Sequence, residues 1–219
     1  MPGENSPDLT SFNGWTLRIR PSASSSPRLL VLLHGWTGDE NSMWVFTRGL
    51  SPDYWIVAPR APHPAEPRGY TWRPLQPGTF GWPSLETLAP AGEELVRMID
   101  GYSTSIGLNA DELDLMGFSQ GAAMVNLLGL LHPERVRRMC VLAGFVPSGL
   151  ERIIARRPLE GKSVFVAHGA RDEMVPIERA RASIELLESA GARVIYCEEN
   201  VGHKLSAACL HALEDYLKD

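Results

Sequence analysis

Residues 117–121 read Gly-Phe-Ser-Gln-Gly, a Gly-x-Ser-x-Gly pentapeptide placed where a predicted strand meets a predicted helix. The short apolar run 113–116 precedes it, and a helical stretch beginning at residue 122 follows it. A turn this sharp brings its two flanks close together, so side chains at positions 117 and 121 would clash. The strained turn exposes the hydroxyl of Ser119, and the dipole of the following helix favours negative charge beside it. The pentapeptide therefore predicts a nucleophilic serine at the edge of a sheet.

The composition is that of an ordinary globular protein, with 44% hydrophobic and 21% charged residues in a chain of 219. This length suits one well-packed domain, so we predict a single domain over residues 1–219 with a flexible N-terminus over about 1–12. The net charge of −5, without a Lys/Arg cluster, argues against nucleic acid as a partner. No apolar stretch approaches the roughly 20 residues that span a membrane.

The cysteines and the N-terminal segment indicate the cellular compartment in which the protein is expected. The first residues are polar and acidic, without the basic and apolar parts of a secretory signal. Cys140 and Cys197 lie in strand-like runs and Cys209 in an apolar helix, and their spacing is not that of metal ligands. We predict buried free thiols, no metal site, no cofactor and a cytoplasmic protein, and we leave a homodimer open.

Predicted strands and helices alternate along the chain, which favours a mostly parallel sheet with helices on both faces. The run 29–33 is continuously apolar, as in a parallel strand covered on both sides, whereas 15–19 alternates like an edge strand. Chemistry in such sheets lies at the carboxyl ends of the strands. Strands are predicted at 15–19, 29–33, 54–58, 113–116, 139–144, 163–167 and 193–197, and helices at 91–105, 119–131, 177–189 and 204–217.

A long connection over about residues 60–90 is rich in proline, glycine and tryptophan and shows no period. Connections of this length in a compact domain are usually functional or disordered, and the aromatic content argues against disorder. We predict that Trp72, Phe80 and Trp82, together with Trp36, line an apolar substrate pocket. The alternative is that these rings only pin the connection to the domain. Arg73 is expected at the surface, in solvent, and contact with an acidic group of the substrate is the alternative.

A serine nucleophile needs a histidine base, and the base needs an orienting acid. Asp172 follows the predicted strand 163–167, and His203 follows the last predicted strand. The chain order Ser119, Asp172, His203 is that of α/β-hydrolases, and the loop 144–149 offers no competing carboxylate. Asp172 could instead be a helix cap or turn residue, and the adjacent Glu173 is the nearest alternative acid.

The developing oxyanion needs backbone donors. The amide of Gln120, directly after the nucleophile, is predicted to be one donor. The loop after the strand 29–33 should supply the second, with Trp36 as the first choice and Thr37 as the alternative. His34, in the same loop, is expected to brace it. His168 is expected to be structural, and the remaining histidines are not well placed for catalysis: His63, His132 and His211.

Four segments together resemble the phospholipase/carboxylesterase family of small α/β-hydrolases, which includes acyl-protein thioesterases and bacterial carboxylesterases. They are the segment 33–41, the pentapeptide with Ala122, the segment 168–176, and Gly202-His203. The resemblance covers nearly the whole chain beyond about residue 29. It implies an α/β-hydrolase fold without a large cap domain and Ser119, Asp172 and His203 as a catalytic triad. Trp36 departs from the small or aliphatic residue usual in the family, which leaves the substrate open.

These observations predict a serine carboxylic-ester hydrolase that acts on a small-molecule ester with a short to medium acyl group. The nearest alternative is an acyl-protein or small-molecule thioesterase, because both reactions pass through the same acyl-serine. A catalytically inactive, hydrolase-like binding protein is the alternative of a different class. Fluorophosphonate labelling separates it from the two enzymes.

Overall fold

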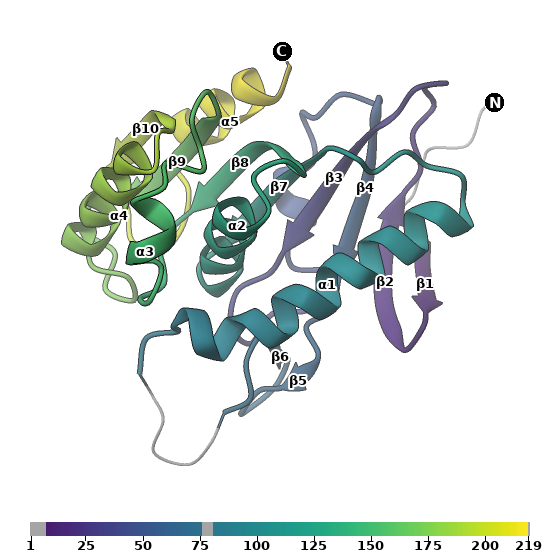
Figure 1. Cartoon of the computed structure of the whole chain (residues 1–219), viewed down its shortest axis with the longest axis horizontal. Helices are drawn as coiled ribbons and strands as arrows, with labels where there is room; N and C mark the ends of the chain where they lie inside the picture. The colour runs from purple at the N-terminus through teal and green to yellow at the C-terminus, as the bar shows by residue number, and fades with distance from the viewer. Residues whose placement is uncertain (1–7, 76–80, 219) are drawn as a thin grey trace.

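One sheet of eight strands runs through the described residues, 8–75 and 81–218, of this computed structural model. Its order is β1-β2-β4-β3-β7-β8-β9-β10 (Figure 1). The pairs β1–β2 and β2–β4 are antiparallel, and the others are parallel. The strands are β1 (Asp8–Phe12), β2 (Trp15–Arg20), β3 (Arg28–Leu33), β4 (Tyr54–Pro59), β7 (Leu113–Phe118), β8 (Val136–Leu142), β9 (Ser163–Gly169) and β10 (Arg193–Glu199).

The helices cover both faces of this sheet. Their bounds are α1 (Leu85–Ser105), α2 (Gln120–Leu131), α3 (Glu151–Ile154), α4 (Ile177–Ser189) and α5 (Ala207–Lys218), with a short 3-10 helix at Trp44–Phe46. Figure 1 shows α1 and α2 on the near face. Along β3, Val31 points into the core that α1 and α2 cover, and Leu32 into a second core that α5 covers. The predicted α/β fold, with a mostly parallel sheet between helices, is confirmed.

Most predicted elements lie within a few residues of the observed ones, but α1 begins at Leu85 instead of residue 91. A capping box explains the earlier start, because the Ser84 hydroxyl accepts from the Thr87 amide and the Thr87 hydroxyl accepts from the Ser84 amide. Pro90 lies inside the helix. Within the described ranges, no helix is both long and apolar enough to cross a membrane.

The N-terminal segment corrects two expectations. Asp8–Phe12 was expected to be flexible but forms β1, which pairs with β2 and takes the edge position predicted for the following strand. Phe12 packs edge-on against Tyr102 of α1, with 5.7 Å between ring centroids. This contact anchors the edge strand to the core. Residues 1–7 of the predicted flexible segment lie outside the described residues.

The long connection after β4 contains a two-stranded hairpin, β5 (His63–Pro64) and β6 (Tyr70–Thr71), below the main sheet in Figure 1. Tyr70 donates its amide to the Gly38 carbonyl at 2.9 Å and accepts from the Thr37 amide at 3.0 Å. The hairpin is therefore joined to the loop that follows β3, at the carboxyl edge of the sheet. Residues 76–80 of this connection are not described.

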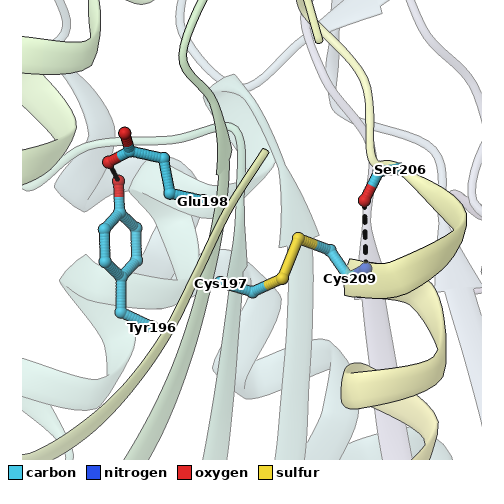
Figure 2. Close-up of a disulfide and its surroundings, with 5 residues drawn as sticks. All are labelled: Tyr196, Cys197, Glu198, Ser206 and Cys209. Carbon is cyan, nitrogen blue, oxygen red and sulfur yellow. Dashed lines mark hydrogen bonds between the residues drawn. A yellow bond between two sulfur atoms is a disulfide. The ribbon is translucent and has the colours of Figure 1, made fainter. Parts of the chain in front are cut away.

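All three cysteines were expected to be free thiols, but two of them form a disulfide. Cys197 of β10 forms a disulfide with Cys209 of α5, across a Cα–Cα distance of 5.6 Å (Figure 2). Cys140 is a free, buried thiol, as predicted. Protein disulfides are rare in the cytosol, so the pairing removes the free-thiol argument for a cytoplasmic protein. The cytoplasmic location and the homodimer stay predictions.

Candidate active site

The predicted sharp turn connects β7 to α2. Ser119 has φ +55° and ψ −115°, a backbone conformation that residues other than glycine rarely adopt. A Cβ on Gly117 would lie 2.2 Å from the Gly121 carbonyl oxygen, and a Cβ on Gly121 would lie 2.0 Å from that of Leu33. Both positions therefore require glycine. The turn is held by the Ser119 amide, which donates to the Leu142 carbonyl on β8 at 2.9 Å.

Asp172 lies just beyond β9 and is buried, at 6% exposure. Its Oδ1 accepts from the amides of Met174 and Val175, each at 2.9 Å, and its Oδ2 lies 2.7 Å from Nδ1 of His203. The neighbouring Glu173 is exposed. The structure therefore pairs the histidine with Asp172 and not with the alternative acid.

His203 follows β10 and reaches the turn that holds Ser119. Its ring packs on Phe118, the residue before the serine, with 4.8 Å between centroids. Ser119 and His203 line one cavity. No hydrogen bond joins their side chains in the described structure, and such bonds are often long in enzymes without substrate. The fold therefore brings together the three predicted triad residues from three distant segments.

The loop after β3 distinguishes the two candidate oxyanion donors. Thr37 has φ +66°, and its amide donates to the Tyr70 carbonyl at 3.0 Å, so it is not available to a ligand. The amides of Trp36 and Gln120 donate no hydrogen bond to any described residue. Both residues also line a cavity with Ser119. Of the two candidates in this loop, only the Trp36 amide is free.

His34 braces this loop, as expected. Its Nε2 accepts from the Ala61 amide at 3.0 Å, which places the proton on Nδ1, and Nδ1 then donates to the Gly35 carbonyl at 2.8 Å. The His34 carbonyl accepts from the indole of Trp72 at 2.8 Å. Burial lowers the pKa of His34 below its usual value, so the neutral ring is favoured.

His168 is buried beside the acid, consistent with the structural role expected for it. Its Nε2 lies 2.8 Å from the Val175 carbonyl, to which it donates, and 3.4 Å from Oδ2 of Asp172. Desolvation lowers the pKa of this histidine too. A neutral His168 thus holds the loop whose amides bind Asp172.

The predicted substrate-contacting aromatics have different outcomes. Trp36 and Trp82 line a cavity of about 270 Å³ that also contacts Ser119. Trp72 does not belong there, because it is fully buried in the hydrophobic core. Phe80 lies outside the described residues. Arg73, expected in solvent, is only 9% exposed, lines the same cavity and donates to the Gly81 carbonyl.

The sequence analysis did not predict several apolar residues of this cavity wall, and Phe145, Met174 and Val175 are among them. Their positions offered a signal, since the first lies a few residues past β8 and the others follow Asp172, all at carboxyl ends of parallel strands. Among the described residues, no cluster of three His, Cys, Asp or Glu side chains is arranged to hold a metal ion.

The family model for phospholipases and carboxylesterases matches residues 16–219. The chain belongs to this family. Carboxylesterase SOBER1 of Arabidopsis thaliana is 30% identical over 151 residues, which make up 66% of this chain and 64% of the relative. The family member described here thus spans about half to two thirds of the first curated relatives it matches.

Two further matches cover more of the chain. A probable inactive carboxylesterase of Oryza sativa subsp. japonica is 28% identical over 92% of this chain and 85% of its own length. The crystal structure of esterase PE8 superposes with a TM-score of 0.80 at 26% identity, covering 91% of this chain and 96% of that one. Because this family contains a relative named as inactive, membership alone does not establish activity.

Proposed function

We propose that this carboxylesterase-family protein is an active serine esterase that hydrolyses short- to medium-chain acyl esters through an acyl-serine intermediate. The main support is the 2.7 Å contact between His203 Nδ1 and Asp172 Oδ2, with His203 and Ser119 on the wall of one cavity. A proton on Nδ1 that is held by the carboxylate leaves Nε2 free to accept the serine proton.

In the first half of the reaction, Ser119 Oγ attacks the ester carbonyl carbon while His203 Nε2 takes the hydroxyl proton. The carbonyl oxygen becomes an oxyanion, and the free amides of Trp36 and Gln120 are the donors we assign to it. Asp172 stabilises the imidazolium, and its own position is fixed by two backbone amides. The bond from carbon to the leaving oxygen then breaks as His203 returns the proton to that oxygen.

The second half repeats this chemistry with water. His203 takes a proton from the water molecule as its oxygen attacks the acyl-serine carbonyl, and the same two amides hold the second oxyanion. Collapse of this second tetrahedral intermediate breaks the bond between the carbonyl carbon and Ser119 Oγ, and Oγ regains its proton from His203. The products are a carboxylic acid and an unmodified enzyme.

The first test compares two adjacent carboxylates. We expect Asp172→Asn to reduce kcat on a p-nitrophenyl ester by about 10⁴-fold, because the wrong histidine tautomer is favoured. Glu173→Gln is the matched control, since Glu173 is exposed, and it should keep the wild-type rate. Equal loss in both variants, or none in either, would contradict the assignment.

Fluorophosphonate labelling tests the inactive alternative. The wild type should be labelled at Ser119 and Ser119→Ala should not, whereas an unlabelled wild type would show a binding protein only. Parallel assays on an oxygen ester and a thioester of the same acid then measure which leaving group is preferred. We expect the oxygen ester to have the higher kcat/KM.

A further inference from the structure

Two cavities meet at Ser119, and among the described residues their walls share this serine, Trp36 and Met174. His203 lines the larger cavity, of about 740 Å³. Gln120 lines the smaller one, of about 270 Å³. The two shared hydrophobic residues are well exposed, at 39% for Trp36 and 58% for Met174. Trp36 and Met174 therefore lie where the two cavities adjoin, next to Ser119.

The proposed reaction, on which this inference rests, decides which part of an ester enters each space. The tetrahedral carbon carries Ser119 Oγ, the oxyanion, the leaving oxygen and the acyl chain. His203 must reach the leaving oxygen with a proton, so the leaving group has to lie in the larger cavity, which both His203 and Ser119 line. The oxyanion faces the free amides. The acyl chain takes the remaining direction, into the smaller cavity.

We infer that the smaller cavity binds the acyl group and the larger one the leaving group, so that the substrates are esters of compact acids with bulky alcohols. This assignment makes the limit on acyl size a property of a few residues in the wall of the smaller cavity. It also makes the enzyme tolerant of the alcohol.

The wall of the acyl cavity is firmly held. Phe145 is 2% exposed, and its carbonyl accepts from the buried Asn126 side chain at 2.9 Å. Its ring meets Trp82 edge-on, with 4.9 Å between centroids. The Arg179 guanidinium lies 4.2 Å from the centroid of the Trp82 ring and 4.7 Å from that of Phe145. Because of these contacts, Phe145 and Trp82 cannot move aside for a longer acyl chain unless the contacts break.

The leaving-group cavity has a different wall. Val45, which is 57% exposed, forms part of it together with Phe46 and Leu205. Lys204, also in the wall, is exposed to solvent. An apolar surface that ends at solvent can bind a large hydrophobic alcohol and let its far end remain in water. The larger volume of this cavity favours bulky leaving groups.

The test is a two-way set of esters measured with the wild-type enzyme. One series keeps the alcohol, p-nitrophenol, and lengthens the acid from acetyl through butyryl and octanoyl to lauroyl. The other keeps the acetyl group and enlarges the alcohol from methyl to hexyl, naphthyl and menthyl. We expect kcat/KM to fall by about tenfold or more between butyryl and lauroyl. We expect no such fall along the alcohol series.

Variants on the two walls test the assignment separately. Phe145→Ala should raise kcat/KM for lauroyl relative to acetyl by about tenfold and leave the alcohol profile unchanged. Trp82→Ala, at a 44% exposed position on the same wall, should act in the same direction if Phe145→Ala does not fold. Val45→Trp is the matched variant in the other cavity. It should reduce hydrolysis of the bulky acetates and leave the acyl profile unchanged.

Two results would overturn the inference. One is a wild type that hydrolyses lauroyl and acetyl esters equally well. The other is an exchange of effects, with Val45→Trp changing the acyl profile and the variants of the smaller cavity changing the alcohol profile. Either result leaves an active esterase with a different substrate orientation. Failure of the proposed function itself appears as no hydrolysis of any ester and no fluorophosphonate labelling of Ser119.

Discussion

Gln120 contributes two different groups to the carboxyl edge of the sheet. Its backbone amide is free beside Ser119, as the sequence motif predicts for an oxyanion donor. Its side chain has a role that the motif did not indicate. The carbonyl oxygen accepts from the Trp72 amide at 3.0 Å and from the Thr71 hydroxyl at 3.1 Å, and all three residues are buried. This one side chain therefore joins the β5–β6 connection to the start of α2.

Replacing the side chain while keeping the amide separates these roles. Gln120→Met should lower the free energy of unfolding by about 1–3 kcal/mol, because the Trp72 amide is left buried without a partner. Thr71→Val should lower the free energy of unfolding by less, because the Trp72 amide keeps the Gln120 side-chain oxygen as its acceptor. Urea unfolding measures both. If Gln120→Met is as stable as the wild type, the side chain does not hold the connection.

At the scale of elements, the segment between β10 and α5 carries the histidine and is closed by a disulfide. His203 lies midway between Cys197 and Cys209 in the sequence. Figure 2 shows the bridge from β10 to the beginning of α5, where the Ser206 hydroxyl accepts from the Cys209 amide at 3.1 Å. Tyr196 and Glu198 extend to the other side of the strand and bond each other at 2.7 Å. The disulfide thus limits the freedom of the loop that positions His203, the proposed base.

Reduction should therefore destabilise the protein. A disulfide that closes a loop of this length restricts the unfolded chain. Reducing it should lower the free energy of unfolding by about 3 kcal/mol. Guanidinium unfolding with and without a phosphine reductant measures this difference. The reductant should lower the stability of the wild type and of Cys140→Ala equally, and should not change that of Cys197→Ala/Cys209→Ala. A wild type that does not respond to the reductant would contradict the disulfide.

At the scale of the whole molecule, two buried histidines are placed at the carboxyl edge where the loops meet. His34 is 1% and His168 2% exposed, and desolvation lowers the pKa of each below the usual histidine value of about 6.5. The unfolded chain therefore binds more protons than the folded one in the interval between the lowered pKa and 6.5. Stability is complete above pH 6.5 and is lost as the pH falls through that interval.

We expect the free energy of unfolding to fall on acidification below about pH 6.5, by up to about 1.4 kcal/mol per pH unit for each of these histidines. His168→Asn should reduce that slope, whatever its stability at pH 8. His211→Asn, at an exposed position on α5, is the matched control variant. Denaturation curves at several pH values give the slopes. Parallel slopes for wild type and His168→Asn would contradict the assignment.

The sequence by itself determined the fold class and the three residues proposed as the triad. The apolar run of β3 and the glycines beside Ser119 are local signals, because burial on both faces and steric clash act over a few residues. Asp172 and His203 were predicted because the carboxyl ends of parallel strands meet at one edge. Local pattern and topology together were enough for these features.

Only the tertiary structure decided which side chains share a space. Trp72 lies in the core and not in the predicted pocket, and Phe145 lines the pocket although it was not predicted to do so. Cys197 and Cys209 met in a disulfide, and Asp8–Phe12 paired as an edge strand. Each of these outcomes depends on contacts between segments far apart in the sequence. The pattern around one residue does not specify which distant partner will pack against it, because that choice is made by the packing of the whole chain.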